Sequence, residues 1–157
     1  MTYTIRGLDP RPFAALFEAG DVTREAALAK VVTVESDRGY LCRVSLEDAR
    51  VGETVLLAHH VSNDVAGPFR MAHAIYVRQG ALAAEPSVDC VPAMLDSRTI
   101  GLRAFAGDGA MRRASLARPG EADGAIRELF SDPGIAYIHA HNAAYGCFLA
   151  AVERCHD

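Results

Sequence analysis

Reactive side chains concentrate in one stretch of the sequence, residues 137–148. The stretch contains two histidines, two tyrosines and a cysteine, namely Tyr137, His139, His141, Tyr145 and Cys147. Histidine changes charge near neutral pH, and a thiolate beside an imidazole is a strong nucleophile. Two of these residues are the candidate catalytic pair, with Cys147 as the nucleophile and His141 as the general base.

The same residues also have a purely structural interpretation. Cysteine is among the residue types most often buried, and a histidine on a covered sheet face usually makes hydrogen bonds within the protein. A cysteine and a histidine that are merely close do not make a reactive pair. The sequence therefore leaves open whether Cys147 and His141 perform chemistry or only pack.

A metal site is a further alternative, because His139 and His141 are two residues apart on an expected strand. Such residues point to the same side and could bind one ion. The third ligand would have to come from His59, His60, His73, Cys147 or Glu153. None of these stands at a recognisable ligand spacing. The prediction is therefore no metal and no cofactor.

The pattern of this stretch predicts a β-hairpin with a five-residue loop at 142–146. In that register His141 lies opposite Cys147, and His139 lies opposite Leu149. A slip of one residue would mix the apolar and polar positions, which supports the register. One face would carry Ile138, Ala140, Phe148, Ala150 and Val152, and the other Tyr137, His139, His141, Cys147, Leu149, Ala151 and Glu153.

The rest of the chain predicts an α+β fold. A hairpin is expected where Gly107-Asp108-Gly109 separates residues 99–106 from 111–117, and one longer helix is expected near residues 120–131. A few short helices complete the expected elements. No internal repeat or linker is visible, so we predict a single domain over residues 1–157, with a mostly antiparallel sheet of seven or eight strands.

Composition restricts the partners and the compartment. The formal net charge of −4 argues against general nucleic-acid binding. No secretory signal or membrane-spanning run is visible, and the four cysteines form no CxxC pair. We therefore predict a cytoplasmic protein that contacts neither nucleic acid nor membrane. The abundance of Arg and Ala over Lys hints at a bacterial source.

Three arginines stand at strand positions, where arginine is unusual: Arg43, Arg103 and Arg154. An unpaired arginine on a sheet is a candidate anion site. Three glutamates could instead neutralise these arginines as ion pairs, namely Glu35, Glu53 and Glu153. The sequence does not choose between the two.

Several segments resemble an uncharacterised bacterial family, domain of unknown function 1203. The segments are residues 39–49, with Cys42 followed by Arg43, residues 75–78, residues 137–142 and the run Gly146-Cys147-Phe148. The chain departs from the family pattern at Leu41, where proline is usual, and at 72–75, where Ser-Gly-Pro-Ile is usual. The resemblance implies no known activity, but it singles out Cys42 with Arg43 and Cys147 with Phe148.

Two hypotheses for the function follow. The first is a small-molecule site lined by Cys42, Arg43, Tyr137 and His139 as binding residues, with Cys147 and His141 as catalytic residues. The second is a non-enzymatic structural module that forms a homodimer through a sheet face or an exposed edge.

Overall fold

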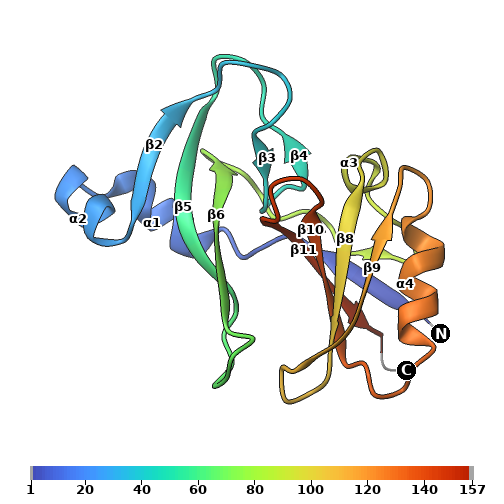
Figure 1. The fold of residues 1–157 in the computed structure, drawn as a ribbon. Coiled ribbons are helices and arrows are strands. Elements are labelled where there is room, and N and C mark those ends of the chain that lie inside the picture. The colour runs from blue at the N-terminus through green and yellow to red at the C-terminus, as the bar shows by residue number, and fades with distance from the viewer. Residues whose placement is uncertain (1, 156–157) are drawn as a thin grey trace. The chain divides into compact units, whose positions relative to one another are not determined.

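The structure is a computed structural model that describes residues 2–155 (Figure 1). Its contacts divide the chain into two compact units. The first unit comprises Met1–Arg6, Val61–Met71 and Glu85–Asp157, and the second comprises Gly7–His60 and Ala72–Ala84. The single domain over residues 1–157 stays a prediction.

Eleven strands and four helices form within the described residues. The first unit holds β1 (Tyr3–Arg6), β7 (Ser87–Val88), α3 (Ala93–Asp96), β8 (Ile100–Phe105), β9 (Met111–Ala117), α4 (Ala122–Phe130), β10 (Tyr137–Asn142) and β11 (Phe148–Arg154). The second holds α1 (Arg11–Glu18), α2 (Asp21–Ala26), β2 (Ala29–Thr33), β3 (Leu41–Cys42), β4 (Glu47–Asp48) and most of β5 (Thr54–Asn63) and β6 (Met71–Arg78), whose joined ends at 61–71 count in the first unit.

The first unit is an antiparallel sheet of six strands in the order β7-β1-β11-β10-β8-β9. Strand β10 lies between β11 and β8, so both of its edges are paired. Its residues alternate between two faces. We call the face of Ile138 and Ala140 the helix face, and the face of Tyr137, His139 and His141 the hairpin face.

Helix α4 packs on the helix face. Its apolar residues recur at helical spacing and are all buried: Ala122, Ile126, Leu129 and Phe130. On the sheet, Ile5, Val152 and Ile138 lie in register on this face and are also buried. Burial of a stripe of this kind supplies most of the stability of a short helix. The predicted longer helix near 120–131 is therefore confirmed.

The second unit is a sheet of five strands in the order β2-β5-β6-β3-β4. A parallel pairing joins Cys42 of β3 to Tyr76 of β6. One apolar cluster includes Leu56, Ile75 and Phe13 of α1, and a smaller one includes Val34 and Val55. Residues 55 and 56 point to opposite faces of β5, so both faces of this sheet are partly covered.

The α+β class with mostly antiparallel sheet is confirmed, whereas the expected number of strands is too low. Strands β3, β4 and β7 are each two residues long. A two-residue strand has no room for an alternating apolar pattern, so sequence periodicity does not detect it. None of the helices within residues 2–155 is long and apolar enough to cross a membrane.

Candidate functional site

The hairpin of β10 and β11 forms, but its register differs from the predicted one. His141 lies opposite Phe148 rather than Cys147, and His139 lies opposite Ala151 rather than Leu149. The register shifts between Ala140 and His141, which marks a β-bulge. The extra residue is on β11, at Leu149, because Ala150 already pairs with Ala140.

The bulge moves one side chain to the other face. From Tyr137 to Ala140, the observed pairing differs from the predicted one by two residues. A shift of two leaves each of these side chains on its predicted face. Beyond the bulge the displacement is one residue, so Phe148 joins the histidines on the hairpin face. Cys147 lies opposite Asn142, whose N–H donates to the Cys147 carbonyl at 2.9 Å. The predicted cross-strand pair of Cys147 and His141 is therefore wrong.

The hairpin face is a continuous cluster of rings around His139. The His139 ring centroid lies 5.1 Å from that of Phe105, 5.2 Å from Tyr137 and 5.2 Å from Phe148. His141 stands at the end of the cluster, 6.0 Å from Phe148. Only 5% of His139 and 1% of His141 is exposed. Both imidazoles are therefore buried members of a packed ring cluster, as the structural interpretation expects.

His141 is oriented by the hairpin loop. Its Nδ1 lies 3.0 Å from the carbonyl oxygen of Gly146, the loop residue whose φ is +73°. A carbonyl only accepts, so the Nδ1 that faces it carries a proton, and the neutral tautomer with that proton has Nε2 as its acceptor nitrogen. This tautomer is the one that a general base at Nε2 requires.

Tyr137 is held by a residue that is distant in the sequence. Its hydroxyl donates to Asn63 Oδ1 at 2.6 Å, and Asn63 Nδ2 donates to the Phe69 carbonyl at 2.8 Å. Burial raises the pKa of Tyr137, and the bond to Asn63 only partly offsets this. Tyr137 is therefore a neutral phenol at physiological pH, with its proton engaged inside the protein.

Arg103 of β8 is the residue of this face whose charge the protein leaves unmatched. It lies directly across from His139 and is half-buried. Its one polar contact is from Nη1 to the thioether sulfur of Met71 at 3.4 Å, and no carboxylate within residues 2–155 pairs with it. Two of the three candidate glutamates pair elsewhere, Glu153 with Arg6 at 3.8 Å and Glu53 with Arg78 at 3.6 Å.

The other two predicted site residues belong to the second unit. Cys42 is fully buried, and its Sγ accepts the backbone N–H groups of Arg78 at 3.3 Å and Ser45 at 3.5 Å. Arg43 is also buried and donates to the Leu41 carbonyl. The predicted site residues thus divide, with Tyr137, His139, His141 and Cys147 in the first unit and Cys42 and Arg43 in the second.

Comparison with known families places this geometry in a context. The family described as "Protein of unknown function (DUF1203)" matches residues 39–154. The chain belongs to this family. The matched region contains both motifs on which the resemblance rests, Cys42 with Arg43 and Gly146-Cys147-Phe148, but not the first strand. No curated protein and no solved structure matches the DUF1203 chain.

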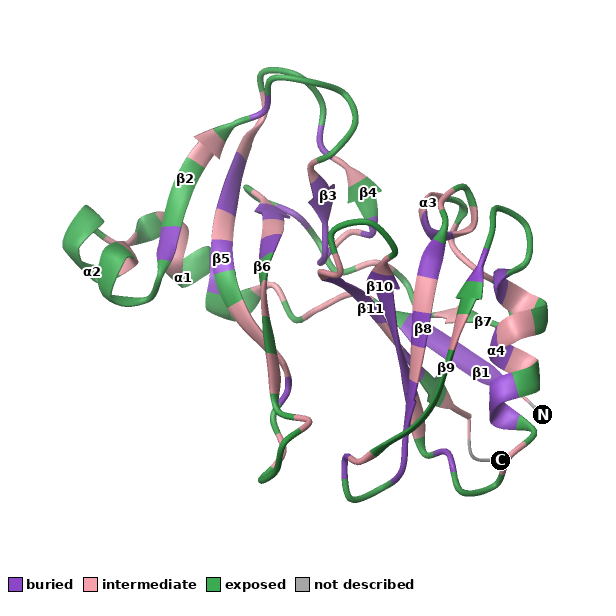
Figure 2. Ribbon diagram, viewed as in Figure 1, coloured by how far each residue is buried: buried purple, intermediate pink, exposed green. Residues whose placement is uncertain are grey.

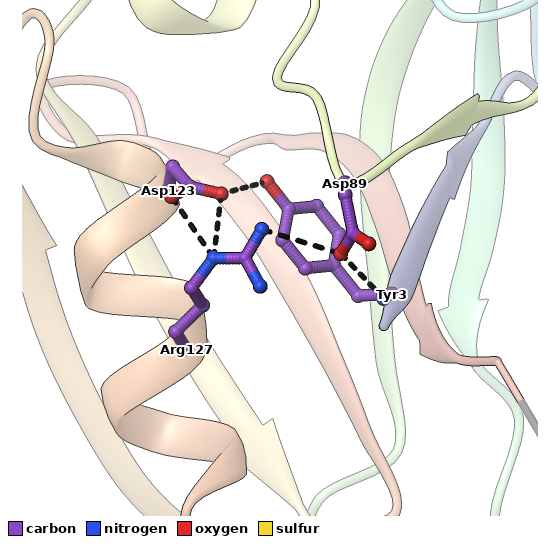
Figure 3. A network of polar contacts seen from close by, with 4 residues as sticks. All are labelled: Tyr3, Asp89, Asp123 and Arg127. Carbon is purple, nitrogen blue, oxygen red and sulfur yellow. Dashed lines mark hydrogen bonds and ion pairs between the residues drawn. The ribbon is translucent and has the colours of Figure 1, made fainter. Parts of the chain in front are cut away.

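A second polar cluster of the DUF1203 chain lies on the helix face (Figure 3). The Tyr3 hydroxyl donates to Asp123 at 2.6 Å, and Arg127 Nε donates to the same carboxylate at 3.0 and 3.1 Å. Arg127 Nη2 also bonds Asp89 at 3.2 Å, and Asp89 accepts the Tyr3 N–H. Burial and the bond to Asp123 raise the pKa of Tyr3 well above its usual value.

Sequence analysis missed this second cluster. Asp123 and Arg127 stand at the i,i+4 spacing of a helical ion pair, which is a visible signal. The contact of Tyr3 with Asp123 joins residues 120 positions apart and leaves no local signal. Each donor and acceptor named here is engaged by another, so the cluster locks α4 to β1 and β7.

Metal binding finds no support in the placement of the ligands. Within residues 2–155, no group of three or more His, Cys, Asp or Glu side chains is close enough to hold an ion. His139 and His141 have ring centroids 6.2 Å apart and lie among aromatic rings. A pair of imidazoles in such a setting lacks the further ligand that zinc or iron requires.

Proposed function

We propose that the hairpin face of the first unit binds a small molecule through an oxyanion, either a carboxylate or a phosphate group, with Arg103 as the anchor. One observation carries this proposal: Arg103 is half-buried and has no carboxylate partner within residues 2–155. A guanidinium offers five N–H donors in a flat fork that matches two oxygens of such a group.

The partly desolvated guanidinium of Arg103 would be stabilised by a bound anion. Partial burial of a cation removes part of its hydration, and a thioether is a weak acceptor that does not replace it. The Met71 sulfur leaves most of the guanidinium donors without a strong acceptor. An oxyanion at Arg103 would recover that interaction, and its partial desolvation would strengthen the bond relative to one at the surface.

The neighbours of Arg103 support binding rather than covalent chemistry. His139 and Tyr137, on the strand across from Arg103, pack with Phe105 of its own strand, and the Tyr137 hydroxyl is engaged by Asn63. The register no longer sets Cys147 opposite His141, so the cross-strand argument for a nucleophile and its base is lost.

The cysteines bear on the cellular compartment. Cys42, Cys90, Cys147 and Cys155 are free thiols in the structure. Reduced cysteines are typical of the cytoplasm. A cytoplasmic protein that binds a small acidic metabolite is therefore the setting that we propose.

The test is saturable binding of simple oxyanions by the full chain. Acetate, benzoate and inorganic phosphate would be titrated while the melting temperature and the heat of binding are measured. We expect at least one of them to bind with a Kd below about 1 mM, which corresponds to about 4 kcal/mol. Arg103→Gln should abolish the binding.

The matched control is Arg112→Gln, because Arg112 is an exposed arginine on the adjacent strand β9. This variant should bind as tightly as the wild type. If none of the three probes binds saturably, or if Arg103→Gln and Arg112→Gln weaken binding equally, the proposal is wrong. A difference in affinity between the carboxylates and phosphate would identify the group that Arg103 prefers.

A further inference from the structure

The two sheets have four edges, and three of them are protected against pairing with another chain. Edge strands β4 and β7 are two residues long. Strand β9 carries adjacent arginines, Arg112 and Arg113, and its pairing with β8 contains a register shift. Short length, charge and bulges are the usual means by which proteins block sheet edges.

The fourth edge, β2, has the least protection of the four. It runs for five residues without proline or bulge, and Lys30 is its one charged residue. Its centre is the β-branched run Val31-Val32-Thr33. Such a strand is a ready template for β-sheet extension.

The hydrogen bonds of β2 show which backbone groups face outward. Val34 N–H donates to Glu53, and His59 N–H donates to Leu28, both within the register that joins β2 to β5. Antiparallel strands alternate bonded and non-bonded pairs, so the even-numbered residues of β2 bond to β5. The N–H and C=O groups of Ala29, Val31 and Thr33 therefore point away from the sheet.

Apolar side chains are exposed beside this edge. Val22 of α2 is 82% exposed, Leu28 is 67% exposed and Val31 is 44% exposed. Helix α2 contributes no buried residue at all, as Figure 2 shows. Leu28 also adopts a left-handed backbone with φ +53°, which is strained for leucine. Exposed apolar side chains next to an open strand edge are typical of a surface that binds a partner.

We propose that β2 is the interface with a second copy of this chain, paired antiparallel about Val31. In this register Val31 lies opposite its copy, and Ala29 lies opposite the copy's Thr33. All the outward groups are then satisfied by about six main-chain hydrogen bonds. The edge is complementary to itself because its outward groups are symmetric about Val31, as a closed two-fold interface requires.

The charges permit this pairing and give it a salt dependence. Lys30 lies opposite Val32 of the second copy, so no like charges are directly opposed. The two Lys30 side chains lie on the diagonal, at about 7–8 Å. Salt screens this mild repulsion, so the dimer should tighten as ionic strength rises. The pairing brings together the two Val31 side chains, which are 44% exposed in the single chain.

The test is the oligomeric state of the full chain by sedimentation velocity from about 1 to 200 µM. Wild type should show a concentration-dependent dimer. Val31→Lys would oppose two lysines at the centre of the pairing and should raise the dimer Kd on the order of tenfold or more. The control is Leu116→Lys, a more exposed leucine on the protected edge β9, which should leave the Kd unchanged.

Amide hydrogen exchange on wild type provides a second readout that does not depend on a variant folding. Raising the protein concentration should slow exchange at Val31 and Thr33, whose N–H groups face outward, and not at Lys30 and Val32, which bond to β5 in both states. A chain that stays monomeric throughout, an unchanged Kd for Val31→Lys, or equal slowing of odd and even amides would each overturn the proposal.

Discussion

The two faces of the first unit's sheet treat arginine in opposite ways. On the helix face, Arg154 donates to the carbonyls of Ile135, Phe130 and Asp132 at 2.7–2.8 Å and stacks over the Phe130 ring. Arg127 is held by Asp123 and Asp89. On the hairpin face, Arg103 meets a thioether.

The difference distinguishes structural charge from charge that is available for binding. A pocket of about 380 Å³ opens beside Arg127 and Arg154, yet the donors that would attract a ligand there already have internal acceptors. Arg103 has the smaller set of contacts and the greater capacity for a new one. Substituting each arginine in turn, and measuring stability and oxyanion binding, therefore tests this difference between the two faces.

The largest expected effect is on Arg154. Arg154→Gln would remove the donors that satisfy the last carbonyls of α4 and the turn after it. An unpaired buried carbonyl costs about 1–3 kcal/mol. We therefore expect Arg154→Gln to lower the free energy of unfolding by about 2–4 kcal/mol. Urea denaturation measures it. Arg118→Gln, at an exposed position, should change stability by less than about 0.5 kcal/mol.

The next effect concerns the cluster of Tyr3 and Asp123. Tyr3→Phe deletes a 2.6 Å bond to a carboxylate and should cost about 1–3 kcal/mol at neutral pH. The ring is retained, so the core position of Tyr3 stays filled. A loss below about 0.5 kcal/mol would show that the helix face does not depend on this contact.

The same cluster predicts a pH dependence. The bonds from Arg127, and then Tyr3, lower the pKa of Asp123 below its usual 3.8, so its stabilisation is present above about pH 4 and is lost as pH falls further. The raised pKa of Tyr3 gives stabilisation that is present below about pH 10 and is lost as pH rises through the folded value. Urea unfolding midpoints at pH 8 and pH 11 measure this effect. Between these pH values, Tyr3→Phe should lose less stability than the wild type.

A smaller effect is expected at the hairpin loop. Gly146 has φ +73°, and a Cβ placed there would lie 4.0 Å from Arg103 Nη2, which is an ordinary contact. Gly146→Ala should therefore cost about 1 kcal/mol from backbone strain alone and leave oxyanion binding intact. Gly107→Ala, in an open turn with a negative φ, is the control and should cost less. A loss of binding in Gly146→Ala would place the ligand against the loop.

Sequence alone predicted the parts of this fold that repeat with a regular period. The stripe of α4, the hairpin of β8 and β9 and the alternation of Ile138 and Ala140 against the histidines all follow from spacing. It failed where one residue breaks the period. The bulge at Leu149 turns Phe148 toward the histidines, and no local pattern marks it. The sequence also did not show that Arg103 is available to bind an anion. Whether a glutamate pairs with it depends on which residues the fold brings together.

The smallest expected effect on stability completes the comparison. Arg103→Gln removes a half-buried cation whose one polar partner is the Met71 sulfur, so little favourable interaction is lost. Without ligand, we expect the free energy of unfolding to change by less than about 0.5 kcal/mol, or to rise, because the cost of partly burying the charge disappears. With a bound oxyanion, wild type should gain stability by mass action while Arg103→Gln should not. A loss of more than about 2 kcal/mol without ligand would place Arg103 with Arg154 as a structural charge, and the two faces of the sheet would then be alike.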